Sequence, residues 1–158
     1  FGNAFSTFIA QNYGAGKAER IRRGVRSAFL TAAVFSILVS AVVVVFAELL
    51  MTIFIDESET EIIAAGVHYL RVEGAFYVGI GILFLLYGLY RAVARPGVSV
   101  VLTVISLGTR VVLAYALPAI PAIGVTGIWA AVPIGWALAD IAGIWYWRKL
   151  SRRGETLL

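Results

Sequence analysis

The sequence has no cysteine, a single histidine and few charges: only 14% of its 158 residues are charged, where a soluble domain has about 25%. Without cysteine there is no disulfide scaffold, no Cys-based zinc site and no thiol nucleophile. One histidine excludes metal or acid–base chemistry built on several imidazoles. Hydrophobic residues make up 61% of the chain and the mean hydropathy is +0.92. No soluble core of this size can bury so much apolar surface, so these shortages argue against a cytosolic enzyme.

Long apolar runs are present instead. An apolar helix needs about 20 residues to cross roughly 30 Å of hydrocarbon, and the alternation expected of a barrel strand is absent. The sequence therefore predicts an all-α integral membrane protein, a polytopic helix bundle. We expect a partial span and four spans, followed by a tail, at residues 1–13, 27–47, 74–90, 98–118, 124–147 and 148–158. The chain starts in mid-hydrophobic sequence, which suggests part of a longer protein.

Alternate connectors carry 11 of the 13 basic residues. They are Lys17, Arg20, Arg22, Arg23, Arg26, Arg91, Arg95, Arg148, Lys149, Arg152 and Arg153. Topology follows the excess of cations in short loops. The end of the bundle that carries these connectors, called the basic end below, is therefore predicted to be cytoplasmic, with the C-terminus inside. The same rule explains the basic segment 17–26 without nucleic acid, which we do not expect as a partner. Six aromatic residues are expected at headgroup level, namely Tyr77, Tyr87, Tyr90, Trp145, Tyr146 and Trp147.

Two local motifs invite a ligand interpretation, and neither meets its pattern. Gly14-Ala15-Gly16-Lys17 lacks the Walker residues on both sides and is better interpreted as a helix end with a glycine cap. The acidic outer turn lacks a calcium-loop pattern. There, Ser58 and Glu61 have capping-box spacing, which predicts a helix starting near Glu59 and continuing into the span at Gly74.

The last span has small residues four apart, at Gly127, Ala131, Gly135, Ala139 and Gly143. This spacing predicts a groove where another helix approaches closely. Asp140 lies at the edge of the groove and is expected to face protein or water. It is either a structural carboxyl or one linked to a proton or substrate, because ionisable groups inside membranes are functional candidates.

Two further spans have one distinctive face each. Ser99, Thr103, Ser106 and Arg110 share a polar face, which predicts either the lining of a water-accessible cavity or packing against polar neighbours. Arg110 is in reach of Asp140 if the two helices are adjacent; Glu73 or a residue upstream of Phe1 is the alternative partner. On the span before it, Tyr77, Gly81 and Phe84 follow helical spacing, a stripe that indicates packing or a binding pocket.

At this point three motifs resemble one family. The segment 10–17, followed by Glu19 and Arg20, is similar to the Gly-Ala-Gly turn that ends the eighth helix of multidrug and toxic compound extrusion (MATE) transporters. Segment 54–57 resembles their outer turn between helices nine and ten. Gly88-Leu89-Tyr90-Arg91, with Pro96 beyond it, resembles the Gly-x-x-Arg end of helix ten. The resemblance covers the chain from the end of helix eight through helix twelve.

The resemblance implies the second lobe of a two-lobe, twelve-helix transporter that opens alternately to either side. It also implies export of organic, often cationic, compounds in exchange for H⁺ or Na⁺. The sequence departs from the family at 92–95, which reads Ala-Val-Ala-Arg where members often have Gly-Ala-Gly-Asp. It also lacks the acidic residue that sodium-coupled members carry within helix ten, which favours H⁺ and the branch whose proton-linked carboxylate lies in the first lobe.

We therefore expect a secondary antiporter, not an enzyme, in the plasma (inner) membrane. No cofactor and no metal site are expected. The expected partners are a small organic substrate, membrane lipid and an N-terminal lobe of the same protein. The candidate substrate- or cavity-lining residues are Tyr77, Gly81, Phe84, Thr103, Ser106, Arg110 and Asp140. Two alternatives stay open: a lipid-linked oligosaccharide flippase of the same superfamily, and a non-transporting membrane subunit.

Overall fold

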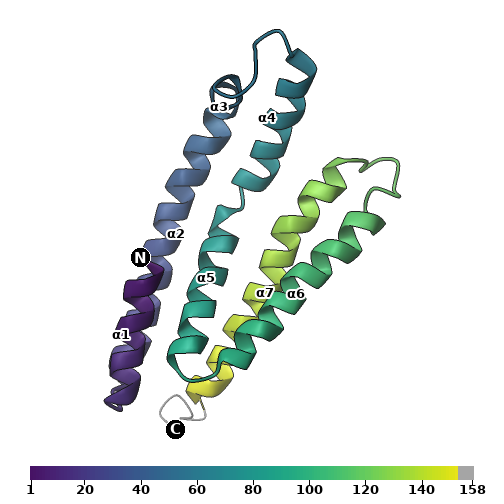
Figure 1. The fold of residues 1–158 in the computed structure, drawn as a ribbon. Coiled ribbons are helices and arrows are strands. Elements are labelled where there is room, and N and C mark those ends of the chain that lie inside the picture. The colour runs from purple at the N-terminus through teal and green to yellow at the C-terminus, as the bar shows by residue number, and fades with distance from the viewer. Residues whose placement is uncertain (153–158) are drawn as a thin grey trace.

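Helices make up nearly all of residues 1–152, the part of the chain that the computed structural model describes (Figure 1). In chain order they are α1 (Gly2–Gly14), α2 (Ala18–Val45), α3 (Ala47–Thr52), α4 (Thr60–Gly74), α5 (Tyr77–Ala92), α6 (Pro96–Ala116) and α7 (Thr126–Arg152). The expected tail beyond Arg152 lies outside the described residues.

Three of these helices, α2, α6 and α7, are long and apolar enough to cross a membrane. The pair α4 and α5 passes the same test as one broken span, bent by 50°. The described residues thus contain three spans, or four with the bent pair, and the 13-residue α1 is shorter than a span. The outward surface of α2 exposes large apolar side chains such as Leu30, Phe35 and Leu38, as expected of a helix that faces lipid.

The bend corrects the expectation of one helix running from Glu59 through Gly74. Helix α4 ends at Gly74, and the amide of Phe76 donates to the carbonyl of Glu73, a tight i−3 turn. Gly74 is buried against α2, where a Cβ would lie 2.8 Å from Cγ1 of Val43. The break therefore lies where α4 packs closely on α2, and glycine permits that approach.

The expected capping box is also wrong. Residue Glu59 is the N-cap of α4 and its side chain caps nothing. The amide and hydroxyl of Ser58 donate instead to Oδ1 of Asp56, at 2.9 and 2.7 Å (N···O and O···O). The side chain of Asp56, two residues earlier, thus accepts the serine hydrogen bonds in place of a cap on the start of α4.

Two helices at the basic end finish with the same turn. After α1, the amide of Gly16 donates to the carbonyl of Tyr13, and the amide of Lys17 to that of Asn12. After α5, Ala94 and Arg95 repeat the pattern with the carbonyls of Arg91 and Tyr90. Both turns are Schellman motifs, which need a left-handed residue; Gly16 has φ +67° and Ala94 has φ +57°. The predicted glycine cap is confirmed at Gly16.

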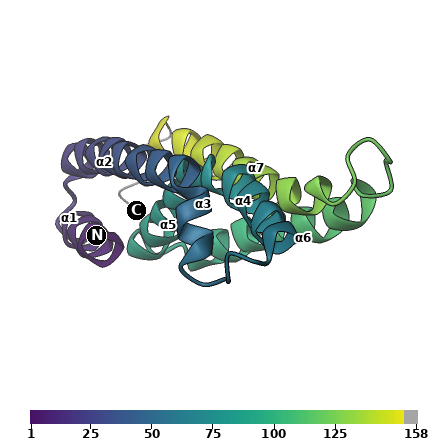
Figure 2. The ribbon, with the colours of Figure 1, turned by 90° about the horizontal axis from the view of Figure 1, so that it is seen from above.

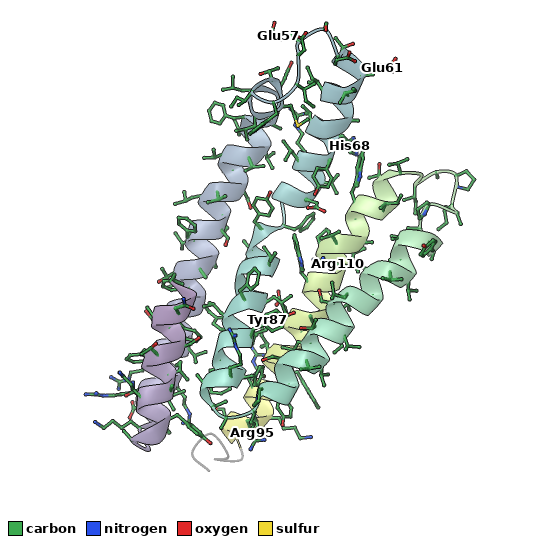
Figure 3. The ribbon with its side chains drawn as sticks, in the orientation of Figure 1. Glu57, Glu61, His68, Tyr87, Arg95 and Arg110 are labelled. Atoms are coloured by element: carbon green, nitrogen blue, oxygen red, sulfur yellow. The ribbon has the colours of Figure 1, made fainter. Side chains whose placement is uncertain are left out.

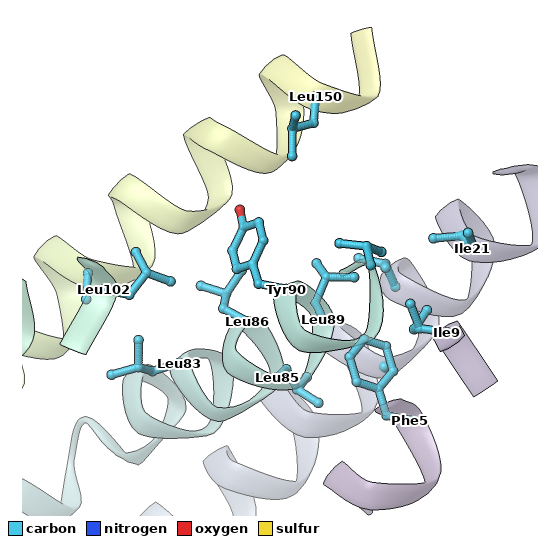
Figure 4. Close-up of a cluster of buried hydrophobic side chains, with 14 of the residues drawn as sticks. Phe5, Ile9, Ile21, Leu83, Leu85, Leu86, Leu89, Tyr90, Leu102 and Leu150 are labelled. Atoms are coloured by element: carbon cyan, nitrogen blue, oxygen red, sulfur yellow. The ribbon is translucent and has the colours of Figure 1, made fainter. Parts of the chain in front are cut away.

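Helix α5 lies in the middle, with α1 and α2 on one side and α6 and α7 on the other (Figures 1 and 2). Figure 4 shows the buried cluster around it, where Phe5 and Ile9 of α1 meet Leu85 and Leu89 of α5. Tyr90, one of the aromatic residues expected near span ends, has a fully buried ring, and its hydroxyl donates to the carbonyl of Gly143.

Helix α6 packs along the stripe of small residues on α7, and all five members of that stripe are buried. A Cβ at Gly135 would lie 2.6 Å from the carbonyl oxygen of Ser106 on α6. One at Gly143 would lie 3.1 Å from Cδ1 of Leu102 on α6 and 2.7 Å from Cδ1 of Leu86 on α5. The predicted groove is confirmed, because only residues without side-chain bulk permit these approaches.

Candidate functional site

A cavity of about 240 Å³ lies where α5, α6 and α7 meet. Its lining consists of Ile80, Leu83, Phe84, Tyr87, Thr103, Ser106, Leu107, Arg110 and Trp136. Four of the seven candidate residues, Phe84, Thr103, Ser106 and Arg110, are therefore brought together here. The polar face of α6 is turned toward α5 and α7, where it lines the cavity.

A second cavity of about 270 Å³ lies between α2 and α5. Its lining consists of Phe35, Ser36, Val39, Tyr77, Ile80, Gly81 and Phe84. It contains the other aromatic–glycine candidates, Tyr77 and Gly81. Both cavities share Ile80 and Phe84, so the two lie on either side of one stretch of α5. At Gly81 the hydroxyl oxygen of Ser36 would lie only 2.7 Å from a Cβ, so this glycine sets the width of the second cavity.

Arg110 enters the first cavity from α6 (Figure 3). Its Cζ lies over the ring of Trp136, 5.3 Å from the ring centre. Its aliphatic stem crosses α7 at Gly135, where a Cβ would lie 2.9 Å from Cγ of the arginine. Its Nε is buried and has no hydrogen-bond partner among residues 1–152. The cation is thus held by an aromatic face and retains a donor with which to meet a polar group.

The hydroxyl groups below Arg110 are partly used by the backbone. Oγ1 of Thr103 donates to the carbonyl of Ser99 at 2.9 Å (O···O), and Oγ of Ser99 donates to the carbonyl of Tyr87 at 3.3 Å. The first bond is the common back-bond within a helix, whereas the second ties α6 to α5. Ser106 is buried at 3% exposure and its carbonyl lies against Gly135. This face therefore combines packing with a polar lining.

Asp140 is outside both cavities. It lies on α7, is 7% exposed, and Oδ2 would be 3.7 Å from a Cβ on Gly79 of α5. The expectation that it faces protein is confirmed, whereas the suggested pair with Arg110 is not formed. In the described part of the chain the one ion pair is the exposed Arg23–Glu19 contact, and Oδ1 of Asp140 has no partner there.

The alternative partner of Arg110 is also engaged elsewhere, since the hydroxyl of Tyr69 donates to Oε2 of Glu73 at 2.9 Å. Within residues 1–152, no cluster of three or more His, Asp or Glu side chains is suited to a metal ion. The described site is therefore a pair of mostly apolar cavities with one embedded cation.

Sequence reasoning missed eight lining residues of the two cavities, among them the aromatic residues Tyr87 and Trp136 of the first cavity. Trp136 is one helical turn before Asp140, so i, i+4 spacing places it on the same face of α7; this signal was available. Tyr87 was placed at headgroup level, but it lines the first cavity and its ring packs edge-on against Phe84, at 6.2 Å between ring centres. Only the position of α6 reveals that role.

The comparisons with known proteins agree with the fold. The MatE family model matches residues 1–116, and no curated protein matches the chain. A solved structure described as the inward-facing conformation of a multidrug resistance MATE family transporter of the MOP superfamily is similar with a TM-score of 0.89 and 22% identity. A crystal structure of MATE in complex with MaL6 is similar with a TM-score of 0.88, also at 22% identity.

Each likeness covers 96% of this chain but only 35% or 34% of the other, so the chain spans about a third of the length of these proteins. Several apolar spans and a family match over residues 1–116 agree in indicating part of a multi-pass membrane protein. The chain belongs to the MATE transporter family.

Proposed function

We propose that the chain forms part of the second lobe of a secondary active antiporter that exports organic, often cationic, compounds in exchange for an ion. The single observation that carries the proposal is the pair of cavities that share Phe84 on α5. They combine apolar walls and aromatic rings with a few polar groups, the composition of small-molecule sites. Membership of the MATE family supports transport as the function of such a site.

The proposed mechanism is alternating access. This lobe and a first lobe elsewhere in the protein rock around a shared site, and substrate and ion bias two arrangements that differ by a few kcal/mol. In this proposal residues 1–158 are the C-terminal part of the second lobe. The inward faces of α5, α6 and α7 supply one wall, with Tyr77, Gly81, Phe84, Thr103 and Ser106 as lining residues.

We place H⁺ ahead of Na⁺ as the coupling ion. The span from Gly74 to Tyr90 has no acidic residue. The family resemblance implies that a sodium-coupled member would carry one in this span. We also propose the plasma (inner) membrane as the location, with the basic end and the C-terminus cytoplasmic. In Figure 3 Arg95 lies at one end of the bundle and Glu57 and Glu61 lie at the other, which supports that orientation.

The test is dye export by the full-length protein in a strain lacking its own efflux pumps. We expect reduced accumulation of several cationic dyes, loss of the effect when a protonophore collapses the proton gradient, and little change when sodium is replaced by potassium. Unchanged accumulation across several dyes contradicts multidrug export. Loss of export on sodium replacement alone contradicts the proton assignment while leaving transport intact.

The flippase alternative requires a broad cationic cavity for a pyrophosphate group. The cavities beside α5 contain one cation, Arg110, held against Trp136, so this half of the site fits a small organic compound better. The alternative of a non-transporting subunit predicts that enlarging or filling the cavities leaves transport by its partners unchanged.

A further inference from the structure

A third and larger cleft lies on another side of α6, with a volume of about 660 Å³. Its lining consists of Arg95, Gly97, Val98, Val101, Leu102, Ile105, Ala142, Trp145 and Tyr146. None of these residues lines either cavity beside α5. Val101 and Trp145 are 56% and 62% exposed, so the cleft opens on the outer surface of the α6–α7 pair within the described chain.

The cleft is polar at one end and apolar along the rest. At the polar end Nη1 of Arg95 donates to the hydroxyl of Tyr146 at 3.1 Å (N···O). Beside it, Nζ of Lys149 lies 5.1 Å from the centre of the Trp145 ring. Segments 91–100 and 141–158 together contain six basic residues and one acidic residue. This end therefore carries positive charge and attracts an anion.

The apolar part has the length of one membrane leaflet. From Arg95 to Ile105 the chain advances ten residues, about 15 Å at the helical rise, which is half of the roughly 30 Å hydrocarbon core. Val98, Val101, Leu102 and Ile105 line that path from α6, and Ala142 leaves room on α7. A tryptophan and a tyrosine stand where the path meets the basic end, the place that such rings occupy at membrane interfaces.

We propose that this cleft is a binding site for an anionic phospholipid of the leaflet at the basic end. The phosphate of its headgroup is held by Arg95 and Lys149, and one acyl chain lies along Val98, Leu102 and Ile105. Basic pockets between membrane helices bind anionic headgroups in this way. Lipid binding in this cleft does not depend on the exported compound, because the cleft lies on another face of α6.

The test uses the purified full-length protein and lipids brominated on the acyl chain, which quench tryptophan on contact. Subtracting the signal of Trp145→Phe isolates the fluorescence of Trp145. We expect brominated phosphatidylglycerol to quench this signal at about a thirtyfold lower lipid fraction than brominated phosphatidylcholine, since Arg95 and Lys149 each contribute about 1 kcal/mol. Dye export by the same preparation is measured separately and does not decide the outcome.

Two pairs of variants locate the site. Arg95→Gln is expected to lower the preference for phosphatidylglycerol about fivefold, the loss of about 1 kcal/mol. Arg91→Gln, which removes an exposed cation of the same turn outside the cleft, is expected to keep it. Ala142→Phe fills the cleft and is expected to weaken quenching by both lipids, whereas Ile141→Phe, at a position 65% exposed and outside the cleft, changes it less than twofold.

Arg95→Lys is the control for a folding defect. It keeps the positive charge and is expected to keep the preference for phosphatidylglycerol. Equal quenching by both lipids, unchanged in Arg95→Gln, shows ordinary lipid contact and overturns the proposal. Absence of any Trp145-dependent quenching shows that another segment of the protein or a second copy covers the cleft, and overturns it as well.

Discussion

The guanidinium of Arg110 stacks on Trp136, with Cζ 5.3 Å from the ring centre, and forms no ion pair with Asp140. Both polar residues lie inside the bundle, yet each has an apolar neighbour. Arg110 lies over the ring of Trp136, and Oδ2 of Asp140 lies beside Gly79 of α5. Arg110 and Asp140 therefore form no salt bridge, although they lie on adjacent helices. The two groups act separately.

A double-mutant cycle tests this independence. For Arg110→Gln and Asp140→Asn we expect a coupling free energy below about 1 kcal/mol, whereas breaking a buried pair costs about 3–5 kcal/mol. The cycle between Arg110→Gln and Trp136→Leu is expected to give about 0.5–2 kcal/mol. The measurement is unfolding of the purified full-length protein in mixed micelles. A coupling above 3 kcal/mol between Arg110 and Asp140 contradicts the arrangement.

Ala94 has a left-handed backbone that glycine adopts without strain. Because that conformation costs a residue with a Cβ about 1–2 kcal/mol, we expect Ala94→Gly to stabilise the protein by about 1 kcal/mol. The matched change Gly16→Ala, in the same turn after α1, is expected to destabilise it by a similar amount. Unfolding in mixed micelles checks both; destabilisation by Ala94→Gly contradicts the turn described here.

Much of this architecture was predictable from periodicity, because packing partners did not need to be known. The small-residue stripe on α7 and the polar face of α6 are local patterns that the fold preserves. The bend between α4 and α5 was not predictable in this way, since the segment around Gly74 contains no proline and the break is associated with close packing on Val43. Likewise, Asp56 and Glu61 both had suitable spacing to bond Ser58, and only the shape of the turn decides between them.

The site was predictable in part for the same reason. Thr103, Ser106 and Arg110 share a helix face, so their common cavity follows from spacing once α6 is a helix. What Arg110 contacts depends on its rotamer and on the depth at which α7 crosses, neither of which is in the sequence. Asp140 was expected to face protein and does so, but its neighbours come from α5, far away along the chain.

The close approach of α6 and α7 at Gly135 gives a further prediction. A Cβ there would meet the carbonyl of Ser106 at 2.6 Å and Cγ of Arg110 at 2.9 Å. We expect Gly135→Ala to cost about 1–3 kcal/mol, because backbone on one side cannot yield. Gly108→Ala on α6 is the control, since nothing lies within 4 Å of its position; it is expected to be neutral or slightly stabilising. Equal effects of the two substitutions on thermal unfolding contradict this packing.

The outer turn has a predictable response to acid. Hydrogen bonds from the hydroxyl and the amide of Ser58 lower the pKa of Asp56 below its usual 3.8, so the ionised carboxylate holds the turn at neutral pH. Its contribution is present above the unfolded pKa and is lost as pH falls through the lowered value. We expect Asp56→Ala to speed hydrogen exchange at the amide of Ser58 at pH 7, where Glu57→Ala has no such effect. Equal exchange in both variants argues against the turn.

Phe84 is the residue through which the proposed transport site can be tested most directly, because it lines both cavities and is 62% exposed within this chain. We expect Phe84→Trp to raise the KM for a bulky cationic dye several-fold while the thermal stability stays within about 0.5 kcal/mol, the usual range for surface substitutions. Val100→Trp is the matched control, since Val100 is 63% exposed on α6 and lines neither cavity. The larger tryptophan leaves less space for a bulky dye than for a small one. The ratio of the KM for the bulky dye to the KM for a small dye is therefore expected to change in Phe84→Trp and not in Val100→Trp. An unchanged ratio contradicts passage of the substrate beside α5.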